Sequence, residues 1–354
     1  MGRGSRATAL TFFLVWLFAL PAAAADDALL PVVLTAGVRT PAGVVLATDD
    51  GLLLLPDFGD RTMKVQALPD SGAVRDLAVA GGILYALTER GVVRVPATGA
   101  PAWLAGPWPA GGDPEQERLS ACDHLTAAAG ALYVHSFNDI FRLDAGGGPP
   151  ERLIHTTENI SMTAVQEGTV WFGSLRGLYR WQAGMPEAEA VSPSQFGLLT
   201  PLVMTCAAVD DGKLLLGTLG AGLLARQPDG AWRVDGSEPD IYRVYPTTPG
   251  NALVLLPPDR WRRWSLTDGW GAAVTLPFGP ESVVLPGDEV VVFESGGNGI
   301  QRWRDDRWET YFAGRRQLFY RGRGSLPAAV AAADSGGRRL LPLLGAAALL
   351  LVVA

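Results

Sequence analysis

Charged side chains are scarce in this sequence, and basic ones are the minority among them. Only 18% of the 354 residues are charged, and the excess of Asp and Glu gives a formal net charge of −7. A protein that binds nucleic acid regardless of its sequence needs a basic face that displaces the counterions of the phosphates. The composition therefore excludes that class, and we expect no nucleic-acid partner.

Cysteine is nearly absent, since only Cys122 and Cys206 occur. No pair of Cys-x-x-Cys clusters is present that could form a structural zinc site. In the repeat alignment given below, both cysteines fall on the first strand of a unit, and the two units are not neighbours. A disulfide needs Cα atoms about 5.5–6 Å apart, which such strands do not offer. We expect two buried free thiols.

Signature motifs of catalysis are also missing. No Gly-x-Ser-x-Gly elbow precedes a helix, and the glycine-rich residues 217–222 lie in a hairpin rather than between a strand and a helix. Two acidic pairs, Asp49-Asp50 and Asp210-Asp211, each precede a glycine, as turn-forming residues do. The sequence thus predicts no catalytic residue and no cofactor, and it leaves an enzyme open as an alternative.

The chain has three histidines, His124, His135 and His155, and all of them fall in the third repeat. The run Cys122-Asp123-His124 looks like a metal-binding motif in isolation. On a strand, however, Cys122 and His124 share one face while Asp123 points to the other. His135 belongs to the next strand and His155 to the outermost one, so we do not expect the three rings to converge. The sequence predicts no metal site.

The N-terminus has the features of a secretory signal. Arg3 and Arg6 precede an apolar run over residues 9–20, and small residues follow it. The run is shorter than the roughly 20 residues that a transmembrane helix needs. We therefore expect a signal peptide over residues 1–25, cleaved before Asp26, and a periplasmic or extracellular protein. An uncleaved membrane anchor is the alternative.

Glycine and proline, by contrast, are abundant in a hydrophobic background. The chain contains 43 Gly and 26 Pro, and 48% of its residues are hydrophobic. This composition suits many short strands joined by tight turns, and it suits neither a helical bundle nor a disordered chain.

A hairpin recurs seven times along the chain. Its turn is often closed by glycine, which tolerates a positive φ at no steric cost. The residues that close the seven turns lie 38 to 48 positions apart and are Gly51, Gly91, Asp139, Gly177, Gly222, Arg260 and Gly299. A single hairpin cannot bury its own apolar faces, so hairpins repeated in this way must stack.

Further strands flank each hairpin. In the fourth repeat the hairpin strands are Val170–Ser174 and Leu178–Trp181, and Ile160–Val165 precedes them. In the last repeat an outer strand follows at Trp308–Phe312. Four short antiparallel strands every ~40–45 residues are typical of a propeller blade. The sequence predicts an all-β, seven-bladed β-propeller with four-stranded antiparallel blades over residues 26–312.

An arginine recurs three positions after the turn residue in five of the seven repeats. Alternation along a strand places these side chains on one face of each blade, at equivalent positions. We expect a charged rim or structural ion pairs there, and a ligand-binding ring of arginines is the alternative. The five residues are Arg94, Arg142, Arg180, Arg263 and Arg302.

The best-preserved repeats resemble a known family. The phrases VWFGSLRGLYRW, LLLGTLGAGLLAR and LYALTERGVVRV are similar to the two-component-regulator propeller repeat, with its Gly-Thr, short turn and Gly-Leu before an aromatic–Arg–aromatic end. The Gly-His and Trp-Asp dipeptides of the WD40 class do not occur in register. The resemblance covers roughly Leu30 to Phe312 and implies a periplasmic sensor or ligand-binding propeller.

The C-terminal segment departs from this pattern. Residues 313–339 are rich in Arg, Ala and Gly and suggest a linker, and residues 340–354 are uncharged and suggest an apolar helix. Fifteen residues of helix span about 22 Å, less than a ~30 Å hydrocarbon core. A sorting tail, a weak membrane tether and a truncated gene model of a longer sensor all remain open. Each interpretation places the propeller near a membrane.

Ligands of propellers usually bind at one end of the central channel, where several blades contribute loops. Turns between second and third strands face the same end as the starts of the first strands. On this basis we predict a polar binding surface formed by Arg90, His124, Asn138, Arg176 and Tyr242. The alternative for each residue is a solvated loop tip.

We predict a non-catalytic ligand-binding or sensor module, whose partner is a small molecule, a glycan or a protein. Converging histidines or carboxylates at the channel end would favour an enzyme instead, such as a lyase or a glycan-acting hydrolase. An exposed apolar patch on one face would favour a protein-binding scaffold or assembly factor.

Overall fold

The computed structural model describes residues 30–31, 33–41, 43–49, 51–55, 64–66, 68, 71–108, 114–210, 212–227, 229–279, 282–287, 289–295, 299–313 and 320–321. The chain divides into two compact units, Val32–Phe319 and a smaller unit made of Met1–Pro31 and Tyr320–Ala354. In the smaller unit, β1 (Leu30–Pro31) pairs with β30 (Tyr320–Arg321). The predicted signal peptide and apolar tail lie outside the described residues.

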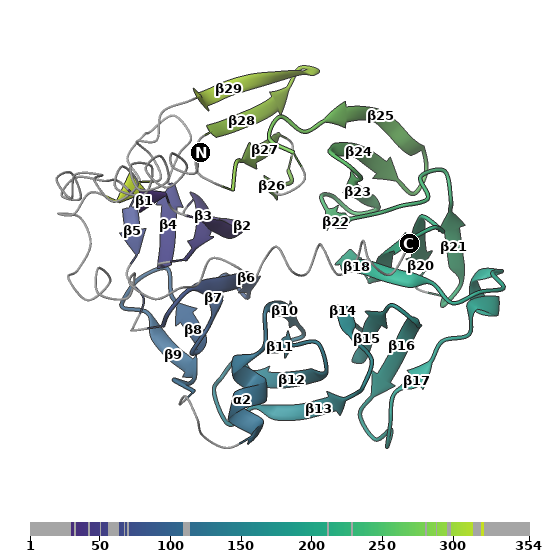
Figure 1. Ribbon diagram of the computed structural model, residues 1–354, viewed down its shortest axis with the longest axis horizontal. Coiled ribbons are helices and arrows are strands. Elements are labelled where there is room, and N and C mark those ends of the chain that lie inside the picture. Colours follow the sequence, from purple (N-terminus) through teal and green to yellow (C-terminus); the bar gives the residue numbers. More distant parts are fainter. Residues whose placement is uncertain are drawn as a thin grey trace, which may run out of the picture. The chain divides into compact units, whose positions relative to one another are not determined.

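The larger unit is a ring of seven sheets, each built from four consecutive antiparallel strands (Figure 1). Blade 1 contains β2 (Leu34–Thr40), β3 (Gly43–Thr48), β4 (Gly51–Leu55) and β5 (Lys64–Gln66); blade 2 contains β6 (Val74–Ala80), β7 (Ile83–Thr88), β8 (Gly91–Val95) and β9 (Ala102–Ala105). Blade 3 contains β10 (His124–Ala128), β11 (Ala131–His135), β12 (Asp139–Asp144) and β13 (Glu151–His155); blade 4 contains β14 (Ile160–Gln166), β15 (Thr169–Ser174), β16 (Gly177–Gln182) and β17 (Glu189–Ala190).

The remaining three blades follow the same order. Blade 5 contains β18 (Val203–Asp210), β19 (Lys213–Leu219), β20 (Leu223–Arg226) and β21 (Trp232–Asp235); blade 6 contains β22 (Arg243–Pro246), β23 (Asn251–Leu256), β24 (Arg260–Ser265) and β25 (Gly269–Thr275). Blade 7 contains β26 (Val283–Leu285), β27 (Val290–Phe293), β28 (Gly299–Arg304) and β29 (Arg307–Ala313). The predicted seven-bladed propeller is confirmed. Two short helices that the sequence did not predict, α2 (Pro114–Ser120) and η1 (Pro193–Phe196), join blades 2 to 3 and 4 to 5.

The core consists of seven apolar clusters, one between each pair of neighbouring blades. Tyr133 of blade 3 packs with Phe172 of blade 4, for example, and Trp171 on the other face of blade 4 packs with Leu214 of blade 5. Alternate residues of one strand therefore serve two different interfaces, which explains why the central strands are apolar on both faces.

Hydroxyl side chains at the end of the second strand stabilise the central turns. Thr48, Thr88 and Thr218 each donate to a backbone carbonyl across the turn. Ser174 and Ser136 instead accept backbone amides of the turn. Side chains of this kind commonly stabilise turns, although the sequence alignment used only the residues that close the turns.

A β-bulge near the start of the first strand links several blades to their neighbours. In blades 1, 2, 4 and 5 the register of the first two strands shifts by one residue at this point. The bulged residue points its side chain at a backbone carbonyl of the next blade. In these four hydrogen bonds Thr35 donates to Val74, Arg75 to Cys122, Ser161 to Met204, and Thr205 to Ile241.

The ring closes between blades 7 and 1 without exchange of a strand. The Leu34 amide donates to the Ser295 carbonyl at 2.9 Å. Arg39 donates from Nε to the Pro286 carbonyl at 3.0 Å and from Nη2 to the Glu289 carbonyl at 3.1 Å. The two blades also share an apolar cluster. Closure therefore depends on packing and a few loop contacts.

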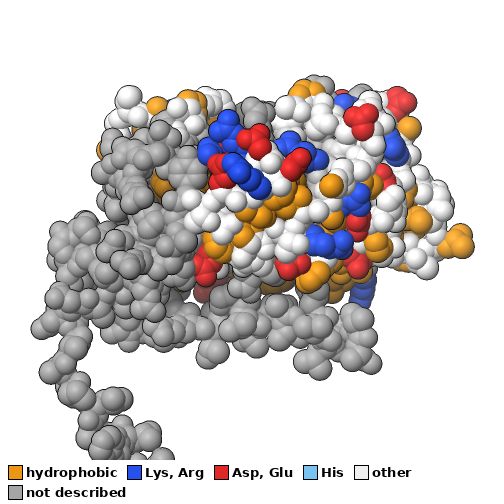
Figure 2. Space-filling view, turned by 90° about the horizontal axis from the view of Figure 1, so that it is seen from above, with side chains coloured by type: hydrophobic (Ala, Val, Ile, Leu, Met, Phe, Trp, Pro, Cys, Tyr) orange, Lys and Arg blue, Asp and Glu red, His pale blue; other side chains and the backbone are white. Residues whose placement is uncertain are grey.

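The recurring arginines form the expected structural ion pairs in three blades. Arg142 lies 3.5 Å from Glu151 and Arg180 lies 2.9 Å from Glu189, each directly opposite in the strand register. Arg302 binds its opposite residue Glu309 at 2.6 Å. Figure 2, which views the edge of the ring at blades 6 and 7, shows such basic and acidic side chains interleaved. Cross-strand pairs of opposite charge stabilise a sheet edge.

The two cysteines are free thiols, as predicted, but Cys122 precedes β10 and does not lie on a strand. Cys122 is buried and Cys206 is half-buried. Burial raises the pKa of both thiols, that of Cys206 to about 11. Both side chains are therefore protonated at neutral pH and poorly nucleophilic.

Candidate functional site

One end of the ring carries the turns between second and third strands and the connections from each blade to the next; we call it the connection end. This follows from the antiparallel order, in which the fourth strand of a blade ends beside the start of the third. The predicted residues Arg90, Asn138 and Arg176 lie in such turns, and His124 and Tyr242 lie at or next to the start of a first strand. All five therefore belong to the connection end.

The predicted residues differ in how far they are engaged by the fold. Asn138 donates from Nδ2 to the Thr156 carbonyl at 3.0 Å and so ties its turn to the following connection. Arg176 has a 75% exposed side chain, whose Nη1 binds Glu158 at 2.9 Å. Tyr242 is 43% exposed. Asn138 therefore has a structural role, while Arg176 and Tyr242 present side chains to solvent.

His124 and His135 lie together, a pairing that the sequence did not predict. The two residues are directly opposite in the β10–β11 register, and their rings stack with centroids 4.6 Å apart. Asp123 joins them, with Oδ1 3.8 Å from Nε2 of His124. The alternation rule failed because Asp123 lies before β10, where its amide bonds to the carbonyl of His135. His155, as expected, does not join this group.

His135 is the buried member of the group. It is 3% exposed, and its Nε2 has no hydrogen-bond partner in the part of the chain that the structure describes. Burial, assisted by the nearby His124, lowers the pKa of His135 well below its ordinary value. The ring is therefore neutral at physiological pH.

Asp76 is a half-buried carboxylate beside this group. Its Oδ1 accepts the amide of Leu77 and its Oδ2 accepts the amide of Leu125 in blade 3, both at 2.8 Å. Burial raises its pKa, and His124, the two amides and Arg243 act against that rise. Both oxygens are committed to backbone donors, so Asp76 connects blades 2 and 3.

Asp76, His124 and Arg243 lie near the start of the first strand in blades 2, 3 and 6. Asp76 and Arg243 pair with the penultimate residue of the second strand of their own blade, and His124 pairs with the last residue of β11. Arg243 has a raised pKa, to which Tyr245 contributes most, with burial acting against it and Asp76 adding to it. The neighbouring His124 and the more distant Arg243 of blade 6 thus both favour the ionised form of Asp76. The sequence analysis missed Arg243, because blade 6 has a different turn length.

A second polar cluster attaches α2 to blade 3. The carboxylate of Asp139, only 5% exposed, lies 2.9 Å from Nδ1 of His155 and 3.6 Å from Nη1 of Arg118 on α2. The sequence identified Asp139 only as a turn residue. A buried carboxylate with two basic partners is a structural anchor, and it explains the position of His155.

Among the residues that the structure describes, large apolar side chains are exposed mainly at the connection end. Val33, Phe137, Leu175, Leu199 and Tyr242 are 49%, 63%, 44%, 100% and 43% exposed, and all five lie in its turns and connections. Val209, 38% exposed, lies at the opposite end of its blade. The asymmetry between the two ends is the observation that favours a protein-binding face.

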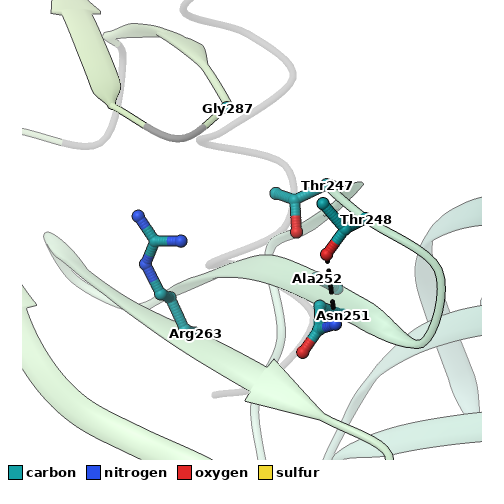
Figure 3. Close-up of a pocket in the computed structure, with 6 residues that line it drawn as sticks. All are labelled: Thr247, Thr248, Asn251, Ala252, Arg263 and Gly287. Carbon is teal, nitrogen blue, oxygen red and sulfur yellow. Dashed lines mark hydrogen bonds between the residues drawn. The ribbon is translucent and has the colours of Figure 1, made fainter.

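A small polar cavity lies at the opposite end, between blades 6 and 7 (Figure 3). Thr247, Thr248 and Asn251 line one wall, Gly287 lines another, and Arg263 extends toward Gly287. Asn251 donates from Nδ2 to Oγ1 of Thr248 at 3.1 Å. The volume of about 230 Å³ is below the ~300–1,000 Å³ of ordinary ligand sites. This cavity is therefore a weaker candidate than the connection end.

Within the described ranges, no helix has both the length and the apolar character needed to cross a membrane. No protein-family model matches the sequence. No curated protein matches it either.

Solved structures support the fold. The chain is similar to the extracellular domain of BT3049 from B. thetaiotaomicron, described as a hybrid two component system, with 13% identity, a TM-score of 0.56, and 76% of this chain and 39% of that chain covered. It is similar to PorZ, a surface component of the type-IX secretion system of Porphyromonas gingivalis, with 10% identity and a TM-score of 0.56. The match covers 82% of this chain and 40% of PorZ. An ancestral GH74 enzyme matches with 12% identity, a TM-score of 0.53, and coverage of 83% and 48%.

The chain thus spans less than half the length of each of these three solved chains. At 10–13% identity the likeness concerns the fold alone. Propellers of one architecture serve unrelated functions, so the site must carry the functional argument.

Proposed function

We propose that this chain is an exported, non-catalytic propeller that binds a protein partner on its connection end. The observation that carries the proposal is the set of five exposed apolar side chains at that end, distributed from blade 1 to blade 6. Leu199 has no shielded surface at all and is 100% exposed. Exposed apolar groups of this kind favour association with another protein.

The arrangement of these side chains favours a broad partner over a small molecule. A small ligand is bound in one concave, largely apolar pocket. Here the apolar groups stand on separate loops around the ring, and polar groups such as Arg176 and His124 lie among them. Aromatic and aliphatic anchors surrounded by polar residues are typical of a protein–protein interface. A folded protein can contact several of these loops at once.

The nearby carboxylates support a non-catalytic role. Asp76 accepts two backbone amides, and Asp139 anchors Arg118 and His155. A general base needs a free lone pair within reach of a substrate proton. Neither carboxylate has the environment of a catalytic group, so binding explains the site better than proton transfer.

Export is part of the proposal. It rests on the signal-like residues 1–25, on the resemblance to two-component-regulator propeller repeats, and on the fold shared with extracellular and surface proteins. A sensor role fits the same comparisons. The protein partner would then be either the signal that is sensed or the next component of the signalling system. The apolar residues 340–354 would keep the propeller near a membrane.

Site-specific photocrosslinking in the producing cell tests the binding face. A photoreactive amino acid is placed singly at position 137, 175 or 199, and at position 209 as the control at the opposite end. We expect the same discrete protein adduct from the three connection-end positions and none from position 209. No adduct, or equal adducts from position 209, would refute the proposed face.

Export is tested separately. The mature chain is recovered from cell fractions, and its N-terminal residues are sequenced. We expect a chain outside the cytoplasm that starts at Asp26 or within a residue or two of it. A cytoplasmic chain that retains residues 1–25 would overturn this part of the proposal.

A further inference from the structure

We propose that Asp123, His124 and His135 bind a divalent transition-metal ion, of which Zn²⁺ is the best fit, at the connection end of blade 3. The site lies at the same end of the ring as the apolar docking face, but it does not depend on that face. Within the described residues, these three form the one group of three or more His, Cys, Asp or Glu side chains whose candidate ligand atoms lie within 4.8 Å of one another.

The backbone holds the three side chains close together. The β10–β11 register places His124 opposite His135, and the Asp123 amide bonds to the His135 carbonyl at 3.1 Å. Zinc bonds to nitrogen and oxygen are about 2.0–2.2 Å long, so ligand atoms must approach to less than ~4.3 Å. Since the side chains of Asp123 and His124 are 49% and 51% exposed, they can rotate toward a bound ion.

The buried ring of His135 gives an independent reason for a ligand. Its Nε2 is fully buried and has no hydrogen-bond partner among the described residues. A buried polar atom without a partner costs free energy, and native proteins rarely leave one. Metal coordination by this side chain would explain why a histidine stands there, where the other blades have apolar residues or glycine, such as Leu87 and Gly173.

The identity of residue 123 gives a third reason. Blades 1, 2, 4 and 5 place a hydrogen-bond donor at the bulge, and that donor binds a carbonyl of the next blade. Asp123 holds the corresponding position of blade 3, directly before the residue opposite His135. An ionised carboxylate cannot donate a hydrogen bond, so it cannot replace those donors. It can ligate a cation.

The donor set selects the kind of metal. Two imidazole nitrogens and one carboxylate suit Zn²⁺, whereas Ca²⁺ and Mg²⁺ prefer sites made of oxygen atoms alone. Three protein ligands leave one tetrahedral position for water or for a group brought by a bound molecule. The half-exposed Asp123 and His124 place that open position toward solvent at the connection end.

Calorimetric titration of the tag-free, metal-stripped chain with ZnCl₂ tests the site. We expect one Zn²⁺ per chain. His124→Ala and Asp123→Asn should weaken binding at least ~10–100-fold, the loss that even outer partners of a metal ligand produce. Both side chains are half-exposed, so these variants should fold. His155→Gln, which changes the histidine bound to Asp139, is the matched control and should bind as the unmodified chain does.

Cobalt spectroscopy gives a second readout. Co²⁺ bound by this donor set should produce visible absorption bands of a four- or five-coordinate ion, and Zn²⁺ should displace them. His124→Ala should remove the bands, while His155→Gln retains them. Absence of stoichiometric binding in the unmodified chain, or equal binding by His124→Ala, would overturn the proposal.

Discussion

Arg75 of blade 2 donates from Nη1 to the backbone carbonyl of Cys122 at 2.7 Å, directly before the first strand of blade 3. The same nitrogen also lies 2.7 Å from the Ser120 carbonyl at the end of α2. One side chain thus satisfies two carbonyls of the neighbouring blade. Since blades interact mainly through apolar faces, such directional contacts fix how one blade is placed on the next.

We expect Arg75→Ala to reduce the free energy of unfolding by about 1.5–3 kcal/mol, the range for hydrogen bonds made by charged donors. Urea denaturation measures the change. Arg94→Ala is the matched control, because Arg94 is an exposed arginine of the same blade opposite Ala102. Equal losses for the two variants would show that the contact with blade 3 is not responsible.

Gly173 of β15 is required by the packing of blade 4 on blade 5. A Cβ atom at this position would overlap the side chains of Met204 and Met162. We expect Gly173→Ala to destabilise the protein by about 1–3 kcal/mol, as overpacked cores do. Gly236→Ala, where the nearest atom to an added Cβ is 3.7 Å away, is the control in a urea titration. Equal losses for the two variants would show that the overlap with Met204 and Met162 is not responsible.

Two equivalent arginines should differ in their importance. Arg302 is 18% exposed and binds Glu289 and Glu309, whereas Arg180 is 46% exposed and binds Glu189 alone. Exposed pairs are screened by solvent and salt, so Arg180→Gln should leave the melting temperature nearly unchanged. Arg302→Gln should lower it clearly, because two partly buried carboxylates lose their nearest partner, and the more exposed Arg304 and Arg307 lie farther from them, at 3.6 and 3.5 Å. The reverse order of melting temperatures would contradict this interpretation.

Asp235 should stabilise the protein at pH values above the ordinary pKa of an aspartate and lose this effect at lower pH. Burial alone would raise the pKa of Asp235, but the indole N–H groups of Trp270 and Trp264 and the contacts with Ser237 outweigh it, so the pKa lies below 3.8. The stabilisation is therefore present above about pH 3.8 and is lost as the pH falls through the folded-state pKa. Melting curves from pH 6 to pH 2.5 should show a steeper acid decline for the unmodified chain than for Asp235→Asn. Parallel declines would show that this carboxylate is not responsible.

The fold could be predicted because its evidence is local. Hairpin strands reveal themselves by short apolar runs, and Gly91 at one turn has a φ of 153°, which suits glycine. The predicted strand Ile160–Val165 corresponds to β14, one residue longer. One hairpin alone is weak evidence for a propeller. Seven hairpins of this kind are strong evidence, because each blade must bury two faces against its neighbours. Helix α2 was missed since its seven residues carry no repeat.

The candidate site could be placed only at the level of loops. Alternation assigned Asp123 to the wrong face, because that residue precedes β10 and the rule holds only within a strand. Arg243 of blade 6 influences the pKa of Asp76 in blade 2, and a local sequence pattern cannot predict an influence between blades that the closed ring brings together. The binding roles of Arg90, His124, Asn138, Arg176 and Tyr242 stay predictions.

The seam between blades 7 and 1 has a consequence for how the ring is assembled. Because every blade uses consecutive strands, the chain could be cut at another inter-blade connection and its ends rejoined at the seam without dividing a sheet. Such circular permutants should fold into the same ring. Among the described residues, Leu34, Arg39 and one apolar cluster hold the seam, and no covalent connection between blades crosses it, so we expect mechanical stretching to open the ring there first. Blade number in such a ring can change by whole-unit duplication, because each blade is built from consecutive strands.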